Sequence, residues 1–331
     1  MARMLVTGGA GFVGAHLVRA LIERGHEVVA LDDLSGGDPG NVDQRAGFVE
    51  GSITDHGLVD RLFAAERFEH VYHLAAYAAE GLSHFIKRFN YTNNLIGSCN
   101  LINAAVNHGT DCFVFTSSIA VYGCGQTPMS EDMTPEPDDS YGIAKRAIEQ
   151  ELAASRRMFG LDHVIFRPHN VYGEFQNLGD RYRNVLAIFM NSIMRGEPLP
   201  IFGDGEQVRS FTYVGDIVDA LADAPFADGA RGEVFNIGTD APCTINYLAD
   251  VVRRAMGVPE HPVVHHSARH EVRQAFSSHE KFRRVFGDQP ATPLHEGVRR
   301  MTAWAKQRGP HTTARFAAIE IEKNLPPSWC D

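Results

Sequence analysis

Three residues in the middle of the chain have the types and spacing needed to remove a proton from a hydroxyl group. Tyr141 and Lys145 form the only Tyr-x-x-x-Lys of the sequence, and Ser118 lies upstream at the end of an apolar run. Residues four apart share one face of a helix, so the Lys145 ammonium can lie beside the Tyr141 phenol. A nearby cation favours the ionised phenol, which can act as a general base near neutral pH. Surface Tyr-Lys pairs on amphipathic helices have the same spacing, so the trio alone leaves both interpretations open.

A glycine-rich turn near the N-terminus could hold the pyrophosphate of a dinucleotide. The segment Leu5–Gly14 is predicted to be a strand, a glycine turn and the start of a helix. Glycines allow the backbone to approach a pyrophosphate closely, and its charge suits a helix N-terminus. Asp32 ends the next strand, 24 residues beyond Gly8. A carboxylate there binds a ribose diol and repels a 2′-phosphate, which favours NAD over NADP. Asp33 is either a second cofactor contact or a turn aspartate.

These motifs must be positioned by an alternation of strands and helices. Short buried strands are predicted at Met4–Thr7, Glu27–Leu31, Gly47–Val49, His70–Leu74, Cys112–Thr116 and His163–Phe166. Helical periodicity is present at Phe12–Arg24, Leu58–Ala65, Phe85–Asn107 and Tyr141–Phe159. This alternation predicts an α/β fold with a Rossmann-type, doubly wound parallel sheet, which binds ligands beyond the carboxyl ends of its strands.

The second half of the chain predicts a smaller α/β C-terminal substrate-binding domain. Residues 1–168 are expected to form the NAD-binding domain, to which residues 212–238 return with a strand at Glu233–Ile237. Residues 169–211 and 239–308 are expected to bind the substrate. Residues 309–331 are predicted to be an extended tail with a short amphipathic piece, and the sequence assigns it no chemistry.

Composition narrows the class of protein. The net charge of −10 argues against a nucleic-acid-binding surface. No apolar run reaches the ~20 residues needed to cross a bilayer, and the first strand leaves no room for a signal peptide, so a cytoplasmic protein is expected. Four histidines, at positions 261, 265, 266 and 270, have no carboxylate or cysteine among them at a familiar ligand spacing. We therefore expect a polar loop there and no metal.

The ordered series of motifs resembles the extended short-chain dehydrogenase/reductase family, in its NAD-dependent nucleotide-sugar epimerase/dehydratase branch. The similarity runs from Met4 to about Trp304. Its markers are Thr-Gly-Gly-Ala-Gly-Phe-Val-Gly at 7–14, His-Leu-Ala-Ala at 73–76, Thr-Ser-Ser-Ile-Ala-Val-Tyr-Gly at 116–123, Tyr-Gly-Ile-Ala-Lys at 141–145, Arg-Pro-His-Asn-Val-Tyr-Gly at 167–173 and Phe-Gly-Asp-Gly at 202–205.

The resemblance implies a set of site residues. The catalytic residues would be Ser118, Tyr141 and Lys145. The cofactor would contact Gly8, Gly11, Phe12, Val13, Gly14, Asp32, Asp33, Ser52, Ile53, Leu74, Ala75, Ala76, Asn94, Ser117, Tyr141, Lys145 and Pro168. The nucleotide sugar would contact Glu80, Ser118, Asn170, Asn184, Val185, Arg209, Arg269 and Glu271. Arginines suit a diphosphate because a guanidinium can bind two oxygens at once.

The residues beside Ser118 bear on the reaction that the resemblance implies. The 4,6-dehydratases have an Asp-Glu pair there, and decarboxylating relatives keep a glutamate, whereas Ile119 and Ala120 cannot transfer protons. The 3,5-epimerising relatives use a cysteine at the Ala120 position. The reaction that is left is oxidation and reduction at one carbon of the sugar. This favours 4-epimerisation of a UDP-hexose, either UDP-glucose/galactose or the N-acetyl forms. NAD would stay tightly bound and be regenerated in each turnover.

Three alternatives stay open at this point. The chain could be a 4-ketoreductase, an epimerase of a GDP-, CDP- or UDP-uronate sugar, or a catalytically silent NAD-binding protein. His169 and Ser210 depart from the commoner residues at their positions and leave the nucleotide base undecided. A small residue, Ala275, falls where a bulky one would exclude N-acetylated sugars. By the same resemblance, helices at 85–107 and 141–159 form a homodimer interface.

Overall fold

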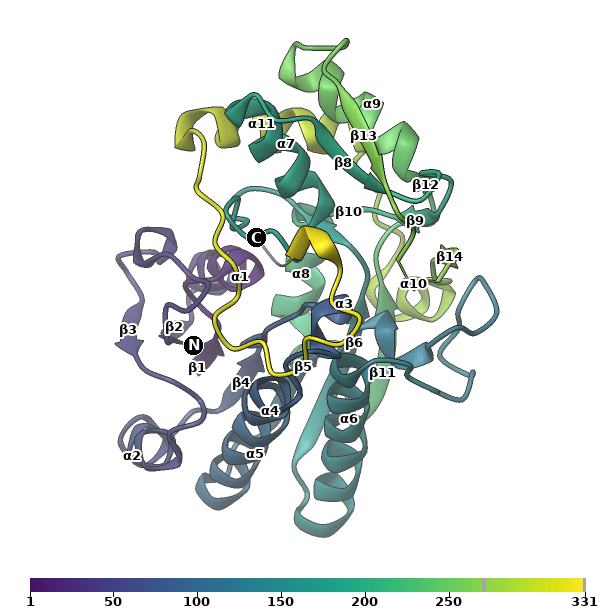
Figure 1. The fold of residues 1–331 in the computed structure, drawn as a ribbon. Helices are drawn as coiled ribbons and strands as arrows, with labels where there is room; N and C mark the ends of the chain where they lie inside the picture. The colour runs from purple at the N-terminus through teal and green to yellow at the C-terminus, as the bar shows by residue number, and fades with distance from the viewer. Residues whose placement is uncertain (270–271, 330–331) are drawn as a thin grey trace.

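Seven parallel strands form the main sheet, in the order β11-β6-β5-β4-β1-β2-β3 (Figure 1). The structure, a computed structural model, describes residues 1–269 and 272–329. The strands are β1 (Arg3–Thr7), β2 (Glu27–Asp32), β3 (Gly47–Glu50), β4 (His70–His73), β5 (Cys112–Thr116), β6 (Asp162–Pro168) and β11 (Glu233–Ile237). The predicted doubly wound parallel sheet is therefore confirmed.

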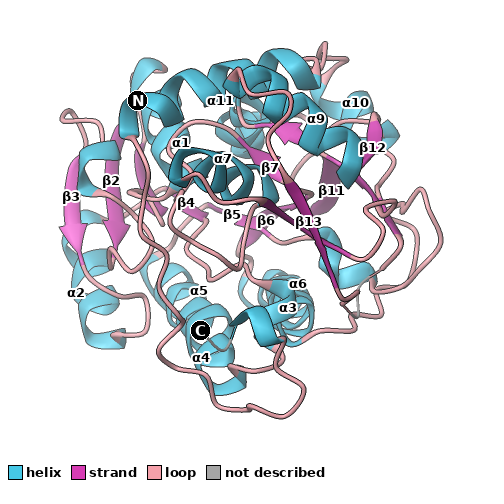
Figure 2. Ribbon diagram, turned by 45° about the horizontal axis from the view of Figure 1, so that its top comes forward, coloured by secondary structure: helices cyan, strands magenta, loops and turns pink. Residues whose placement is uncertain are grey.

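The side chains of each strand point alternately to the two faces of the sheet, and they form two hydrophobic layers, one on each face. Met4 and Val6 belong to one core cluster and Leu5 to the other, because successive side chains of a strand point to opposite faces. Figure 2 shows helices on opposite sides of the strands. One layer holds α1 (Phe12–Glu23) and α8 (Gly215–Asp223), and the other holds α2 (His56–Glu66), α5 (Gly97–His108) and α6 (Ser140–Phe159).

The helix predicted at Phe85–Asn107 is confirmed from Lys87 to His108, but one of its turns is wider than an α-helical turn. It consists of α4 (Lys87–Tyr91), a π-helical turn at Thr92–Ile96 and α5. The sequence did not predict the wider turn, because hydrophobic periodicity does not reveal it. In that turn the Asn93 side chain donates to the Phe89 carbonyl, at 2.9 Å. Such turns are frequent at functional sites, and Asn93 lines the cavity described below.

The remaining elements form a smaller layer above the carboxyl ends of the strands (Figure 1). Its helices are α7 (Val185–Arg195), α9 (Ile245–Met256), α10 (Glu280–Phe286) and α11 (Leu294–Arg308). Its short strands are β7 (Val171–Tyr172), β8 (Leu199–Phe202), β9 (Val208–Ser210), β10 (Thr212–Tyr213), β12 (Pro242–Thr244), β13 (Val263–His266) and β14 (Gln274–Ala275). Between these elements the chain returns to the main sheet, where β11 pairs with β6.

The tail after α11 runs back across the molecule towards α3 (Glu80–Ser83) and α4 (Figure 1). It contains one short helical turn, at Pro327–Trp329. Within residues 1–269 and 272–329, no helix has both the length and the apolar character needed to cross a membrane.

Acid should destabilise the fold through the buried histidine of β6. His163 is 3% exposed, and its Nδ1 has no hydrogen-bond partner among the described residues. Burial lowers the pKa of His163 from 6.5 to about 4. Between these pH values the unfolded chain binds more protons than the folded one, so lowering the pH favours unfolding. The expected loss from this group is on the order of 3 kcal/mol at pH 4.

Urea unfolding at pH 7 and pH 5 checks this expectation. Between pH 7 and pH 5, the free energy of unfolding should fall by about 1 to 2 kcal/mol less in His163→Leu than in the wild type. His295→Gln, at an exposed position of α11, is the matched control and should follow the wild type. Equal losses in wild type and His163→Leu would show that His163 does not contribute to the acid sensitivity.

Candidate active site

The turn between β1 and α1 has a backbone geometry that requires glycine. Gly8 has a φ of +71°, and a Cβ atom on Gly14 would lie 2.0 Å from the Gly8 carbonyl oxygen. Gly11 caps α1 without a side-chain hydrogen bond, and the first turn of the helix carries no acidic residue. The N–H groups at this helix end can therefore bind an anion such as a pyrophosphate.

Asp32 lies at the carboxyl end of β2, beside this turn. Its Oδ2 accepts a hydrogen bond from the Ala10 amide at 3.0 Å, and its Oδ1 accepts one from the Leu34 amide at 2.8 Å. Burial raises the pKa of Asp32. Each carboxylate oxygen keeps a second lone pair, so the side chain can hold the turn and still accept from a ribose hydroxyl. Asp33 accepts from the Ser35 amide at 2.9 Å, as a turn aspartate does.

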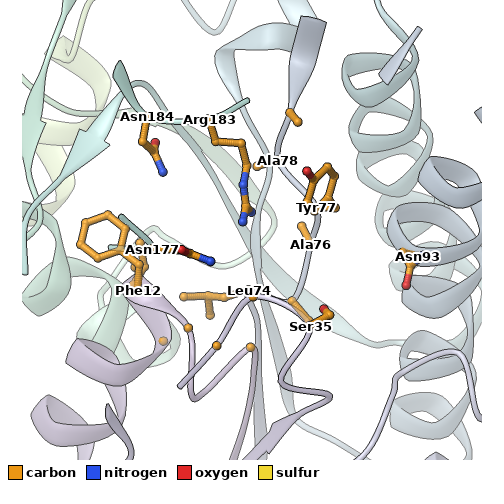
Figure 3. Close-up of a pocket in the computed structure, with 18 of the residues that line it drawn as sticks. Phe12, Ser35, Leu74, Ala76, Tyr77, Ala78, Asn93, Asn177, Arg183 and Asn184 are labelled. Carbon is orange, nitrogen blue, oxygen red and sulfur yellow. The ribbon is translucent and has the colours of Figure 1, made fainter. Parts of the chain in front are cut away.

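A cavity of about 480 Å³ extends from the glycine turn to the end of β5 (Figure 3). Most of the residues predicted to bind the cofactor line it: Gly8, Gly11, Phe12, Val13, Gly14, Asp32, Asp33, Ile53, Leu74, Ala75, Ala76, Ser117, Tyr141 and Pro168. The glycine positions let the backbone form this wall, since a Cβ atom on Gly8 would lie 2.9 Å from the Ala75 amide nitrogen. The structure thus gathers residues that are far apart in the sequence.

Three predicted cofactor residues lie outside this lining: Lys145, which lies beside the Tyr141 ring, and Asn94 and Ser52. Asn94 accepts from the Tyr77 amide at 2.9 Å and donates to the Tyr77 carbonyl at 3.1 Å, so it fixes the loop after β4 and does not face the cavity. The Ser52 hydroxyl is 2.9 Å from that of Thr54. Through these contacts, Asn94 and Ser52 stabilise the chain segments that form the cavity wall.

Several lining residues were not predicted. They include Ser35, Gly36, Gly37, Tyr77, Ala78, Asn93, Asn177 and Arg183. Arg183 extends into the cavity opposite Tyr77, with its guanidinium carbon 4.6 Å from the centre of the Tyr77 ring (Figure 3). The glycine pair at 36–37, three residues after Asp33, was a signal that could have been used. Asn93 lies in the π-helical turn, and the remaining residues lie on loops without periodicity, where the sequence gives no such signal.

Ser118, Tyr141 and Lys145 converge where β5 ends and α6 begins. The α6 helix starts here because Asp139 accepts from the Gly142 amide at 2.8 Å. Lys145 Nζ donates to the Thr116 carbonyl at 2.7 Å and lies 5.6 Å from the centre of the Tyr141 ring. Lys145 therefore lies beneath the cavity, next to the face of the phenol, and Ser118 and Tyr141 form its wall.

The electrostatics of this trio differ from the simple expectation of an ionised phenol. Burial raises the pKa of Tyr141, and the Glu80 carboxylate raises it further, while a hydrogen bond with Ser118 lowers it. Burial also lowers the pKa of Lys145 to about 7, and the Glu149 carboxylate partly opposes this. The spacing of Tyr141 and Lys145 correctly predicted that the two side chains are close. It did not predict that burial disfavours the charged form of both groups.

A buried ionic network around Glu149 lies one helical turn after Lys145 on α6. The Glu149 carboxylate accepts from the Arg167 guanidinium at 2.8 and 2.7 Å and from the Ser117 hydroxyl at 2.6 Å. Arg146 is 3.0 Å away on the same helix. The Glu149 and Arg167 side chains are almost completely buried. Removal of one member would leave the other charge unpaired in a medium of low dielectric constant.

A second cavity, of about 1040 Å³, adjoins the first. It is lined by the predicted substrate residues Glu80, Ser118, Asn170, Asn184, Val185, Arg209 and Arg269. Ser118 and Asn184 line both cavities, so the two cavities meet at Ser118. Ile119 and Ala120 also line the second cavity, and neither can transfer a proton.

The two predicted phosphate-binding arginines lie on the far side of this cavity. Arg209 donates to the Val208 carbonyl at 2.8 Å and to the Val272 carbonyl at 2.6 Å. The guanidinium carbon of Arg269 lies 3.1 Å from the centre of the Phe202 ring and 4.6 Å from that of Trp329. Both guanidinium groups are thus held by these neighbours, and both residues line the cavity.

Two predicted features fall on residues that the structure does not describe. Glu271, expected to hold a ribose diol, lies outside the described residues, as does His270 of the histidine-rich loop. In the described part of the chain, no three His, Cys, Asp or Glu side chains are grouped so that they could hold a metal ion.

The fold and the paired cavities define a class of protein, a doubly wound α/β enzyme that uses a dinucleotide. The residues present fit that cofactor, because a glycine turn at a helix N-terminus, the Asp32 carboxylate and apolar walls follow one another along one cavity. A sequence profile of the NAD dependent epimerase/dehydratase family matches residues 4–238. The chain belongs to this family.

Individual relatives are similar over nearly their whole length. The UDP-glucose 4-epimerase of Mycolicibacterium smegmatis is 36% identical over 303 residues, which are 89% of this chain and 96% of that protein. A solved UDP-glucose 4-epimerase of Thermotoga maritima, with UDP-glucose, has a TM-score of 0.88 and 36% identity, and the match covers 92% of this chain and 99% of that one. The UDP-N-acetylglucosamine 4-epimerase of Methanobrevibacter ruminantium has a TM-score of 0.86 and 27% identity, over 93% and 99%.

Proposed function

We propose that this enzyme is a nucleotide-sugar 4-epimerase that acts on a UDP-hexose. The observation that carries the proposal is the junction of the two cavities. Ser118 and Tyr141 lie there, and the neighbouring Ile119 and Ala120 offer no second acid or base. Such a site can move one proton at one carbon. Elimination of water would need further proton-transfer groups beside Ser118.

The roles proposed for the chain's own residues follow from their positions. Tyr141 takes the proton of the sugar 4-hydroxyl and later returns it, and Ser118 donates a hydrogen bond to the same oxygen. The positive charge of Arg183 opposes the effect of burial on the pKa of Tyr141, and Lys145 lies beside the face of the phenol. NAD, when bound, supplies the hydride acceptor and a further positive charge beside this phenol. The larger cavity gives the sugar room to turn about its diphosphate link between the two proton transfers.

The relatives support a UDP-hexose as substrate, either UDP-glucose or its N-acetyl form. Proteins named UDP-glucose 4-epimerase and UDP-N-acetylglucosamine 4-epimerase are both similar to this chain. Ala275 lines the larger cavity. Its single methyl group leaves space for an N-acetyl substituent, so we propose that both forms can enter.

The arrangement of the chain and its assembly are also proposals. We assign residues 1–168 and 212–238 to the NAD-binding domain and residues 169–211 and 239–308 to substrate binding, because β11 pairs with β6 while the intervening elements surround the larger cavity. Ile143, Met158 and Phe159 are exposed apolar side chains of α6. They support a homodimer through this helix and α5. We further propose that the protein acts in the cytoplasm and binds neither nucleic acid nor membranes.

Incubation of the purified protein with single nucleotide sugars, without added NAD, tests the proposed function. UDP-glucose, UDP-N-acetylglucosamine, UDP-glucuronate and GDP-mannose would be compared, with products resolved by NMR of the anomeric and H4 signals. A 4-epimer formed from UDP-glucose or UDP-N-acetylglucosamine is the expected result. Consumption of added NADH with a 4-keto sugar, and no epimer, would replace the proposal by a ketoreductase. A 4-epimer formed only from GDP-mannose or UDP-glucuronate would reject the UDP-hexose.

A further inference from the structure

We propose that the C-terminal tail, residues 309–329, forms one wall of the nucleotide-sugar cavity and that Trp329 is a substrate-binding residue. Its role would be to hold the Arg269 guanidinium against the nucleoside diphosphate part of the substrate. The inference rests on the proposed function in that it takes a nucleoside diphosphate as the ligand. It starts from the lining of the larger cavity, which includes Asn324, Leu325, Pro326, Pro327 and Trp329.

The tail is tied to the substrate-binding side where it leaves α11. The His311 amide donates to the Asn191 side chain at 2.8 Å, and the Asn191 side chain donates to the His311 carbonyl at 3.0 Å. Further along, the Phe316 amide donates to the Tyr182 hydroxyl at 2.9 Å. Both partners belong to the region around the start of α7, so the first third of the tail is fixed to that region.

The tail is then tied to the opposite side, at the start of α4. The Glu320 carboxylate accepts from the Arg88 and Phe89 amides, at 3.0 and 3.1 Å, and so caps this helix from a distant part of the chain. The Glu320 amide donates to the Phe85 carbonyl at 2.8 Å. The tail therefore bridges the two sides of the site, as its course in Figure 1 shows.

The end of the tail is buried in an aromatic cluster at the cavity. Trp329 is 3% exposed, and its ring centre lies 5.2 Å from that of Tyr182 and 6.0 Å from that of Phe85. A Cβ atom on Gly81 would lie 3.3 Å from the edge of the indole, so a larger residue there would push against it. The indole thus has one defined position between α3 and α7.

Trp329 contacts the charge that is expected to bind the diphosphate. The Arg269 guanidinium lies between the rings of Phe202 and Trp329, at 3.1 and 4.6 Å. A cation held between two aromatic faces is fixed in place, and the planar fork of a guanidinium matches two phosphate oxygens. Because the guanidinium is already ordered, less conformational entropy is lost when the ligand binds.

The position of Trp329 can be tested by fluorescence, because the chain has only two tryptophans. Trp304 lies on α11 against Phe175, away from both cavities. Trp304→Phe leaves Trp329 as the single emitter, and Trp329→Phe leaves Trp304 as the control emitter. Titration with UDP and with GDP should change the emission of Trp329 in a saturable way and leave that of Trp304 nearly unchanged.

Kinetics separate a binding role from a purely structural one. Trp329→Ala should raise the KM for the nucleotide sugar about tenfold while kcat stays within about twofold, because the contact serves binding and lies away from the reacting carbon. Trp329→Phe keeps an aromatic face and should recover most of the loss. If the role is only structural, Trp329→Ala should lower the melting temperature by the same amount with and without substrate.

The outcomes distinguish the tail from the proposed function. UDP binding that leaves the Trp329 emission unchanged, or a Trp329→Ala enzyme with unaltered or lower KM, would overturn the role of the tail and leave the function in place. UDP binding that changes the emission, in a protein that turns over no nucleotide sugar, would support the tail and reject the epimerase. If neither UDP nor GDP binds the folded wild type, both proposals fail.

Discussion

Tyr141→Phe should reduce 4-epimerase turnover by about a thousandfold, with the fold and the bound cofactor preserved. Tyr141 is 5% exposed, so phenylalanine fills the same buried space and only the hydroxyl is lost. That hydroxyl is the group that we expect to take the sugar proton, and Ser118 cannot replace it because an alcohol is a much weaker base than a phenolate. The measurement is kcat by NMR of the H4 signal, together with the NAD content released on denaturation.

Tyr172→Phe is the matched control for this substitution. Tyr172 is also buried, and its hydroxyl makes one long contact, 3.4 Å to the Leu294 carbonyl. This variant should keep kcat within about twofold, because it removes a hydroxyl of similar burial outside both cavities. Full activity of Tyr141→Phe would reject the general-base role, and loss of NAD in that variant would show that the hydroxyl serves binding instead.

Glu149→Met should be the most destabilising single substitution near the site, by about 3 kcal/mol. It removes the partner of the buried Arg167 guanidinium and the acceptor of the Ser117 hydroxyl. It also removes the carboxylate that raises the pKa of Lys145, so the pKa of that amine should fall further below its ordinary value. Thermal unfolding should show a melting temperature lower by at least about 5 °C, and turnover should fall with the loss of positive charge beside Tyr141.

Two further variants show whether the unpaired charge is the cause. Glu151→Gln changes an exposed carboxylate two residues along the same helix and should alter stability by less than about 0.5 kcal/mol. Glu149→Met combined with Arg167→Met removes both charges and should be more stable than Glu149→Met alone. A double variant that is no more stable than the single one would mean that the cost lies in lost packing or in Ser117, and not in the isolated guanidinium.

Much of the fold follows from short-range patterns in the sequence. Each strand from β1 to β6 begins within one residue of its predicted start. All of them except β3 are largely buried, and a buried parallel strand is a continuous apolar run with clear ends. The glycine turn was predicted with its function because a local backbone requirement leaves a local signature. Gly8 and Gly14 are examples: Gly8 has a positive φ, and a Cβ atom on Gly14 would meet the Gly8 carbonyl oxygen across the turn.

The candidate site was predicted less completely, since part of it is built by long-range contacts. Arg183 and Asn177 reach the cofactor cavity from a loop, and Trp329 reaches the substrate cavity from the end of the chain. No periodic pattern identifies such positions. Asn94 was assigned to the cofactor by its place in the motif series, whereas its amide holds the Tyr77 backbone. A motif indicates where a residue lies along the chain and not which neighbour its side chain binds.

The order of strands in the main sheet has a consequence for synthesis of the protein. β6 is complete at Pro168, whereas its neighbour β11 begins only at Glu233. While the ribosome makes residues 169–232, the outer edge of β6 has no strand beside it, and an unpaired edge can recruit another chain. A nascent chain that pauses in this interval should therefore be more prone to aggregate than one that has passed Ile237. Translation speed over these codons should influence the yield of folded enzyme even though it changes no amino acid.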